Sequence, residues 1–424
     1  HTVNAPLNNP RGLTWDGKYL WTVDNNEDKI VQFDPNDGTT INTFKSPAKD
    51  PRGITFDGKY LWISDRMKDE LYMVSPEDGS VIIITEAPGK FTRGLAYFDN
   101  HLWANDSQSD KVYQMAVDDG ETIRKTNPHH AKVTYTHQVT NFGPGMLKEL
   151  DVHIAIPRDR KNQELKQEPS FSPEYTEEAA DQWGQRTAHF SEKQIEPGEM
   201  INYEMSVEAT TYDTRWFIFP EKVGSLDDIP DAIKDKYLKN NEKYQYSHPI
   251  IRDGIKKALG NQTNDNPYWK ARALFNYLID NMYYEMVGGW NTAPTVLDRG
   301  NGSCSEYTFV YISMCRAVGI PARYVGSVVV RGDDASLDDV FHRWAEIYLP
   351  NYGWVPVDPS GGDQKLPRDQ ANYIGHLSHR FLITTQSGGG SETMEWTYNS
   401  NDSWVTEPKT YVVSDNFADW APLE

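Results

Sequence analysis

Short apolar runs alternate with turn residues through the first 124 residues, and the whole pattern repeats. Arg11, Arg52 and Arg93 mark three copies that are spaced 41 residues apart. Each copy begins Arg-Gly-apolar-x-aromatic, passes through Asp-Gly or Asp-Asn, and reaches Leu-Trp. Asp-Gly between two short apolar runs is typical of a β-hairpin. A second turn follows in each copy, so the pattern predicts four short strands per repeat.

Four strands in 41 residues match the size of one β-propeller blade. The repeats resemble the blades of bacterial propellers with the pattern R-G-[LI]-x-[WF]-D-G-x-x-[LI]-W. Three blades are fewer than the about four to eight of a closed propeller, and a β-trefoil is the alternative fold. No catalytic residue type recurs, so we expect Arg11, Arg52 and Arg93 to pack the blades. Two chains pairing through their repeats, as a homodimer, would close the ring. The alternative is a monomer with an open arc of blades, in which the sandwich caps one flank.

Strict alternation of apolar and polar residues replaces this pattern from residue 125 to about residue 225. It is clear at 132–140, 150–156 and 200–207. A period of two predicts strands that bury one face. We therefore expect a small antiparallel β-sandwich at 125–225, with His137 and His153 on solvated faces.

The rest of the chain, 226–424, is predicted to be an α+β domain. Apolar residues first take helical spacing and then return to strand-like runs. A helix from Ser305 to Val318 is marked by Ser303 as a candidate N-cap and by Gly319 and Pro321 at its end. The expected helices and strands are 231–239, 249–259, 267–279, 305–318, 324–330, 341–349, 354–358, 381–385 and 410–413.

The start of the helix at 305–318 carries a cysteine. Cys304 is placed where unpaired backbone N–H groups and the helix macrodipole favour a thiolate, the nucleophilic form of the side chain. The other cysteine, Cys315, is eleven residues further on, a rise of roughly 16 Å along a helix. The two sulfurs are too far apart to bond, so we expect Cys315 to be a free, buried thiol.

A histidine and an aspartate follow on two predicted strands. His342 shares a strand face with Trp344, while Ala345 and its apolar neighbours share the opposite, core face. After a turn at 350–353 the chain returns, and a loop of odd length puts Asp358 on the face of His342, as a diagonal neighbour or nearer. A nucleophile, a base and a group that orients the base are thus all available.

The motifs around these residues resemble the transglutaminase-like superfamily of papain-like enzymes. The resemblance covers about 267–359 and implies that Cys304 is the nucleophile, His342 the base and Asp358 the orienting acid. Where the family often has a small residue this chain has Arg343, and we expect that difference to affect substrate preference. The motifs are Gly302–Glu306, Arg316–Arg323, His342–Glu346 and Gly353–Pro359.

Aromatic residues near the predicted triad are candidates for contact with substrate. Tyr284 and Trp290 lie on the segment that leads to Cys304, and Trp344 lies on the strand of His342. An acidic loop from Asp333 to Asp339 precedes that strand. A calcium site there is the alternative to a solvated loop, but the loop lacks recognisable ligand spacing. We expect no metal and no cofactor.

Charge and termini narrow the range of partners. The formal net charge of −20 argues against nucleic acid and against an anionic membrane surface as partners. No apolar run approaches the roughly 20 residues of a membrane span. The chain starts at His1 without a signal peptide, which suggests a processed protein, and we expect a secreted or cell-envelope location.

The predicted chemistry is cysteine-dependent acyl transfer on an amide bond of a peptide or protein substrate. If water accepts the acyl group, the chain is a peptidase or amidase, which is the function we expect. If an amine accepts it, the chain is a cross-linking transglutaminase. The non-enzymatic alternative is a binding or scaffold protein that uses the propeller repeats as an interaction module.

Overall fold

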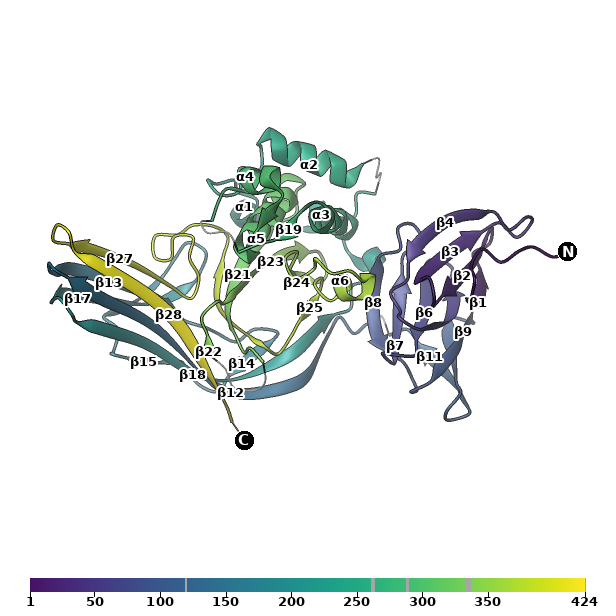
Figure 1. The fold of residues 1–424 in the computed structure, drawn as a ribbon, viewed down its shortest axis with the longest axis horizontal. Helices are drawn as coiled ribbons and strands as arrows, with labels where there is room; N and C mark the ends of the chain where they lie inside the picture. The colour runs from purple at the N-terminus through teal and green to yellow at the C-terminus, as the bar shows by residue number, and fades with distance from the viewer. Residues whose placement is uncertain (119, 261–263, 287–289, 333–336, 424) are drawn as a thin grey trace. The chain divides into compact units, whose positions relative to one another are not determined.

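The structure is a computed structural model that describes residues 1–118, 120–260, 264–286, 290–332 and 337–423 (Figure 1). The chain divides into two compact units. One contains His1–Thr122, Phe217–Lys222 and Gly361–Ile374, and the other contains the remaining residues. The sequence predicted three consecutive domains instead, and the difference arises because the chain crosses between the units more than once.

Each sequence repeat forms its own antiparallel sheet. The first two sheets have four strands each, and the third has three, all in sequential order. The third repeat lacks the predicted fourth strand among the described residues because the chain passes from it into a long strand of the other unit. The strands are β1 (Pro10–Trp15), β2 (Leu20–Asp24), β3 (Lys29–Phe33), β4 (Thr40–Lys45), β5 (Pro51–Phe56), β6 (Leu61–Asp65), β7 (Glu70–Val74), β8 (Val81–Glu86), β9 (Thr92–Phe98), β10 (His101–Asp106) and β11 (Lys111–Ala116).

The hairpin turn of each of the first two repeats is built around one aspartate. Asp16 accepts hydrogen bonds from the backbone N–H groups of Lys18 and Tyr19, and one oxygen accepts the indole N–H of Trp21 at 2.7 Å. In the second repeat, Asp57 bonds to the indole of Trp62 at the same distance. The recurrence of Asp-Gly-Lys-Tyr-Leu-Trp therefore reflects one turn and its buried tryptophan.

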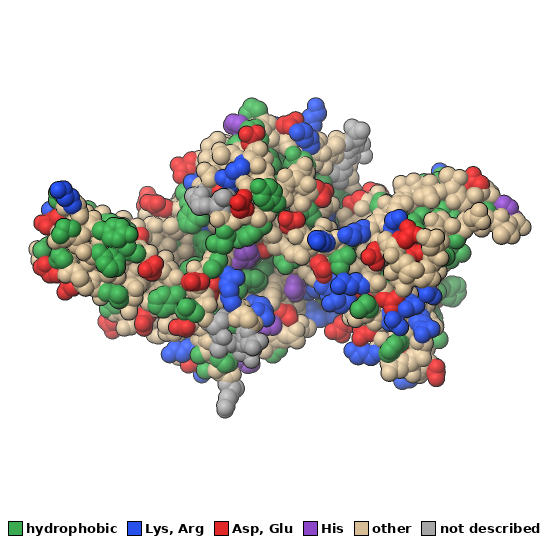
Figure 2. Space-filling view, in the orientation of Figure 1, with side chains coloured by type: hydrophobic (Ala, Val, Ile, Leu, Met, Phe, Trp, Pro, Cys, Tyr) green, Lys and Arg blue, Asp and Glu red, His purple; other side chains and the backbone are tan. Residues whose placement is uncertain are grey.

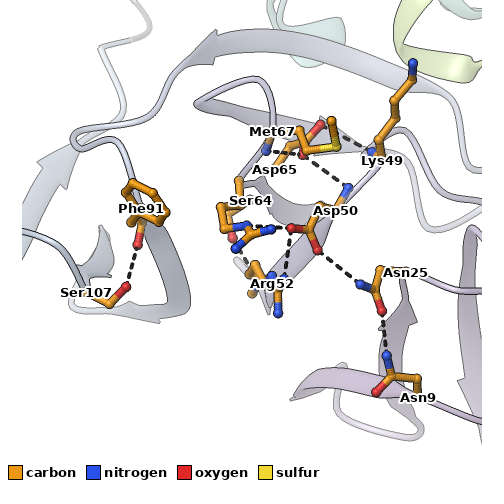
Figure 3. A network of polar contacts seen from close by, with 12 residues as sticks. Asn9, Asn25, Lys49, Asp50, Arg52, Ser64, Asp65, Met67, Phe91 and Ser107 are labelled. Carbon is orange, nitrogen blue, oxygen red and sulfur yellow. Dashed lines mark hydrogen bonds and ion pairs between the residues drawn. The ribbon is translucent and has the colours of Figure 1, made fainter.

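A polar network ties the first repeat to the second (Figure 3). Asp50 pairs with the guanidinium of Arg52 at 2.9 Å and with that of Arg66 at 2.6 Å. Its other oxygen accepts a hydrogen bond from Asn25 of the preceding repeat at 3.1 Å. Arg52 thus pairs with the aspartate of its own repeat that also contacts the preceding one, and a packing role for Arg11, Arg52 and Arg93 stays a prediction.

Two later segments of the chain complete this unit. They include the 3₁₀ turn η1 (Pro220–Lys222) and the short helix α6 (Pro367–Ala371). Ala371 is buried in the hydrophobic cluster of the repeats, and Arg368 forms an ion pair with Glu70 on β7. The sequence predicted 361–374 as part of the C-terminal domain, and these contacts correct that assignment.

The other unit contains the predicted sandwich, built from two antiparallel sheets. Its central strand, β12, pairs with β18 on one side and β28 on the other (Figure 1). The prediction that 410–413 extends the catalytic domain is wrong, because β28 belongs to the sandwich. The sandwich strands are β12 (Ile123–Gly143), β13 (Leu147–Ala155), β14 (Gln163–Leu165), β15 (Ser170–Ser172), β16 (Glu177–Ala180), β17 (Arg186–Ile195), β18 (Met200–Trp216), β22 (Leu337–Asp338), β25 (His376–Leu377), β27 (Ser400–Thr406) and β28 (Tyr411–Pro422).

His137 departs from its predicted place on a solvated face. Only 1% of its surface is exposed. Its ring bonds to the hydroxyl of Ser400 at 2.8 Å and to the carboxylate of Asp402 at 3.0 Å. Both partners lie on β27, a C-terminal strand of the opposite sheet, whose presence in the sandwich the local pattern did not reveal.

A four-stranded sheet and a group of helices form the rest of this unit, with the helices together on one side of the sheet in Figure 1. The strand order is β24-β23-β21-β26. The longest runs of buried residues lie on α5 and β21, which pack together at the centre. The elements are η2 (Leu226–Asp228), α1 (Asp231–Tyr237), α2 (Pro249–Leu259), α3 (Pro267–Asn281), β19 (Tyr283–Tyr284), α4 (Ala293–Arg299), β20 (Asn301–Gly302), α5 (Cys304–Ala317), β21 (Ala322–Val329), β23 (His342–Leu349), β24 (Gly353–Val357) and β26 (Phe381–Ser387).

The chain has more acidic than basic residues, with a formal net charge of −20. On the face shown in Figure 2, acidic and basic side chains are interspersed. In the part of the chain that the structure describes, no helix has both the length and the apolar character needed to cross a membrane.

Candidate active site

Cys304 is the first residue of α5, as the sequence predicted. Ser303 is the N-cap, and its backbone N–H donates to Glu306 Oε2 at 3.2 Å, one half of a capping box. The sulfur is therefore held at the positive end of a 14-residue helix, with 9% of the residue exposed. Cys315 is buried on the same helix, and both cysteines are free thiols.

His342 is the first residue of β23 and faces Cys304. The imidazole and the backbone N–H of Arg343 both act on the sulfur and lower the pKa of the thiol. The strand pairs with β21, where Ser327 lies opposite His342, and packs against α5. The histidine and the cysteine thus come from two elements that are fixed against each other in the core.

Asp358 holds the other nitrogen of the imidazole. A loop of three residues joins β23 to β24, and Ala345 pairs with Val357, so Asp358 follows diagonally from His342 on the same face. Asp358 therefore lies on the strand face of His342, as the odd loop length predicted, and His342 Nε2 and Asp358 Oδ2 are 2.7 Å apart. Ser360 donates its hydroxyl to the other oxygen of Asp358, also at 2.7 Å. The carboxylate is therefore oriented on both sides.

The electrostatics of the pair favour charge separation. Burial opposes the ionisation of Cys304, but the hydrogen bond and charge of His342 outweigh it and lower the pKa of the thiol. Burial also disfavours the imidazolium, yet the charge and hydrogen bond of Asp358 raise the pKa of His342 to about 10. Both shifts favour a thiolate beside an imidazolium over the neutral pair.

Trp344, expected to contact substrate, is buried instead. It has 1% of its surface exposed and packs against Phe381 with 5.0 Å between ring centroids. Its ring and that of Phe381 each lie 5.7 Å from the imidazole of His342. β23 is covered on both faces, contrary to the single core face expected, and Trp344 supports the base from within.

Tyr284 lies at the rim of the site. It is 45% exposed, and its strand β19 runs parallel to β20, where it pairs with Gly302 just before Cys304. Partial burial and the nearby negative charges of Cys304 and Asp358 raise its pKa. Tyr284 is therefore exposed next to the segment that carries Cys304, and its contact with a substrate stays a prediction.

Trp290 is partly buried beside the site, and Gly288 and Gly289 before it lie outside the described residues. Its ring lies 6.3 Å from that of Tyr398 and 4.8 Å from the guanidinium carbon of Arg343. Arg343 is fully buried, so it presents no surface to a substrate. The expected influence of Arg343 on substrate preference therefore cannot act through direct contact.

Glu306 was not singled out from the sequence. It is fully buried, forms an ion pair with Arg299 at 2.8 Å, and accepts hydrogen bonds from the backbone and side chain of Asn291. It therefore holds both α4 and the segment after Trp290 against the start of α5. The spacing Ser303-x-x-Glu306 is a capping-box pattern that identifies this residue from sequence.

Asp338 is a second buried carboxylate, although the sequence predicted a solvated loop at this position. It accepts hydrogen bonds from the backbone N–H groups of Val329 at 2.7 Å and Phe341 at 3.0 Å, and pairs with Arg331 at 2.9 Å. Phe341 has φ of 58°, a strained value held by this turn directly before His342. The loop therefore has a structural anchor at the entrance to β23.

Within the described residues, no group of three or more His, Cys, Asp or Glu side chains is arranged so that it would hold a metal ion. Two of the four aspartates in the acidic loop considered for calcium, Asp333 and Asp334, lie outside the described residues.

Comparison with known proteins identifies the central segment. The family model of the transglutaminase-like superfamily matches residues 256–359, which include Cys304, His342 and Asp358. Residues 256–359 form a transglutaminase-like core. The sequence resemblance is thus confirmed for this segment, and the fold class, β-rich repeats and sandwich with a transglutaminase-like core, is confirmed with it.

Relatives of the transglutaminase-like core are distant. An uncharacterized protein of Haemophilus influenzae is 29% identical over 169 residues, 33% of this chain and 45% of that protein. The uncharacterized protein YebA of Bacillus subtilis is 26% identical over 162 residues, 32% of this chain and 22% of that protein. The matched segment is therefore less than half the length of either relative.

One solved structure is similar over much of the chain. It is named "a Putative Cysteine Protease from Cytophaga hutchinsonii". The match covers 71% of this chain and 93% of the chain in that structure, with a TM-score of 0.51. The sequence identity is 14%, so the likeness shows a shared fold.

Proposed function

We propose that this chain is a cysteine-dependent enzyme that hydrolyses amide bonds of a peptide or protein, with Cys304, His342 and Asp358 as its triad. The observation that carries the proposal is the placement of His342 between Asp358 and Cys304: its Nε2 lies 2.7 Å from Asp358 Oδ2, and the imidazole acts on the Cys304 thiol. It supplies a nucleophile, a proton carrier and an orienting carboxylate in contact order.

The reaction follows from these positions. The Cys304 thiolate attacks the carbonyl carbon, and the electron pair of the carbonyl moves to oxygen, where the backbone N–H of Cys304 at the helix start donates to it. The imidazolium of His342 then gives its proton to the leaving amine, and a thioester remains on the enzyme. Water, deprotonated by His342, attacks the thioester and releases the acid and the thiol.

Two variants test the assignment of the nucleophile. We expect Cys304→Ala to abolish turnover of a fluorogenic peptide library and Cys315→Ala to leave most of it. Cys315 is the matched control because it is a thiol on the same helix, yet burial raises its pKa. Inactivation by iodoacetamide that modifies Cys315 alone would refute the proposal.

The acyl acceptor is measured in the same assay. Hydrolysis predicts release of free acid that does not depend on an added amine, whereas a transglutaminase would incorporate a labelled amine donor into the product. A binding or scaffold protein would show neither reaction, and its Cys304 would not react with iodoacetamide near neutral pH. Free acid without amine incorporation is the expected result.

A further inference from the structure

Arg343 follows His342 on β23 and is fully buried. Aromatic rings surround its guanidinium: its central carbon lies between 4.2 Å and 5.3 Å from four ring centroids, the separation typical of cation–π contacts. The four rings belong to Tyr398 at 4.2 Å, Tyr324 at 4.5 Å, Trp290 at 4.8 Å and Phe309 at 5.3 Å. The positive charge is therefore held in an apolar enclosure at the centre of the core.

The hydrogen bonds of this guanidinium are incomplete. Nη2 donates to the carbonyl oxygen of Trp396 at 2.7 Å. Nε and Nη1 are buried and have no hydrogen-bond partner in the described part of the chain. Within the same residues, no carboxylate forms an ion pair with Arg343. A buried charge without an anionic partner is costly, and aromatic faces offset only part of that cost.

Arg316, at the other end of α5, shows what a structural arginine looks like in this core. It is also buried, and its guanidinium carbon lies 4.5 Å from the ring centroid of Tyr244. All three of its nitrogens donate to backbone carbonyl oxygens, including Nε to Ala322 at 3.0 Å and Nη1 to Lys239 at 2.6 Å. The core therefore satisfies one buried guanidinium fully and leaves the other short of partners.

Arg343 differs from Arg316 in lying against the nucleophile. It directly follows His342 on β23, and its backbone N–H and side-chain charge are among the groups that lower the pKa of the Cys304 thiol. Thr308 on α5 reinforces this contact, since its hydroxyl bonds to the carbonyl oxygen of Cys304 at 2.8 Å and approaches that of Arg343 at 3.4 Å. The sulfur is thus the group beside Arg343 that gains negative charge when it ionises.

We propose that Arg343 is a positioning residue for the nucleophile, whose buried positive charge is balanced by the Cys304 thiolate and holds the sulfur in that form alongside His342. The charge acts through a region of low dielectric, where it is weakly screened. The inference rests on the proposed function, because it assigns Arg343 to the same thiolate.

The experiment measures the alkylation of Cys304 by iodoacetamide as a function of pH in the full chain. All variants are made in a Cys315→Ala background, so that the measured alkylation is that of Cys304. We expect Arg343→Gln and Arg343→Met to move the midpoint of the rate profile to higher pH and to lower the rate at pH 6 by about tenfold, which is one unit of pKa. Arg343→Lys keeps the charge and is expected to restore most of the rate.

Arg316→Gln is the matched control, a buried arginine at the end of α5 opposite to Cys304. It is expected to lower the urea midpoint and leave the alkylation midpoint unchanged. Far-ultraviolet circular dichroism identifies the variants that fold. If Arg343→Met does not fold, the alkylation midpoints of Arg343→Gln and Arg343→Lys still test whether the charge of Arg343 acts on Cys304.

The outcomes separate the two proposals. A wild-type Cys304 that reacts only at the pH of an ordinary thiol would contradict the proposed function itself. A reactive wild-type Cys304 together with an unchanged midpoint in Arg343→Gln would overturn the role of Arg343 alone, as would an equal loss of rate in the lysine variant.

Discussion

His342 and Asp358 are hydrogen-bonded at 2.7 Å across the β23–β24 hairpin, as diagonal neighbours on one face. The bond holds Nε2 of the imidazole towards the carboxylate and leaves the other nitrogen for the Cys304 thiol. Because the hairpin loop has three residues, the position of Asp358 follows from strand pairing alone. The relationship therefore determines which nitrogen of His342 can exchange a proton with the sulfur.

We predict that Asp358→Asn lowers kcat by a factor on the order of 10² to 10⁴ and leaves the fold intact, because an amide presents a donor to Nε2 and favours the wrong tautomer. Peptide turnover and circular dichroism measure the two effects. Asp339→Asn, an exposed aspartate in the loop before His342, is the control and is expected to retain activity. Wild-type kcat in Asp358→Asn would mean that another group orients the imidazole.

The pH profile of kcat/KM is expected to be bell-shaped. Activity rises with pH as Cys304 loses its proton, with a midpoint below the usual range for a thiol because its pKa is lowered. It falls near pH 10, where His342 loses the proton that the leaving amine requires. The two midpoints belong to the coupled pair.

The carboxylate of Asp358 raises the pKa of His342, so its removal should move the alkaline limb to lower pH. Asp358→Asn measured over the same pH range checks this sign. An alkaline limb that stays near pH 10 in that variant would show that Asp358 is not the cause.

Glu306→Gln is predicted to lower the free energy of unfolding by about 1–3 kcal/mol, because the buried ion pair loses its carboxylate and Arg299 loses its anionic partner. The cost stays moderate since the side chain of Arg299, its partner, is 30% exposed and retains some contact with water. Urea unfolding measures the change, and Asp298→Asn, an exposed acid on α4, is the control. Equal urea midpoints for the two variants would contradict a role for Glu306 at the start of α5.

Much of the site was predictable because it depends on local chain geometry. The N-cap Ser303, the helix start at Cys304 and the parity of Asp358 each follow from spacings of a few residues. The hairpins of the repeats follow from the same kind of rule, since Asp-Gly fixes a turn and the pairing is between adjacent strands.

The errors concern contacts between distant segments. The pairing of β28 with β12 joins residues near 415 to residues near 138, and no local pattern marks it. The burial of His137 depends on the same long-range assembly, because its partners are Ser400 and Asp402. The enclosure of Arg343 likewise takes rings from separate segments, among them Trp290 and Tyr398. Sequence periodicity reports which face of a strand is apolar, and it does not report what covers that face.

Equivalent positions in the repeats differ sharply in exposure. Leu13 on β1 is 61% exposed, whereas Ile54, its counterpart on β5 of the second repeat, is 2% exposed. Ile54 is buried because its sheet has a neighbouring sheet on either side, as the contacts of β5 with β1 and β9 show. In the third repeat, Phe98 is 72% exposed and Val112 68% exposed. Both outer sheets therefore present apolar side chains of the kind that the middle sheet buries.

We predict that two chains associate through these outer sheets, because contact with a sheet of the second copy would bury Leu13 as the middle repeat buries Ile54. Light scattering at micromolar concentration is expected to give twice the mass of the chain. Leu13→Asp combined with Phe98→Asp should return the mass to that of one chain, since an unpaired carboxylate opposes burial. Val405→Asp, at a 52% exposed position on β27 of the other unit, is the control and should leave the dimer intact. A wild-type chain that is monomeric under these conditions would rule the dimer out, and dissociation by Val405→Asp would place the interface elsewhere.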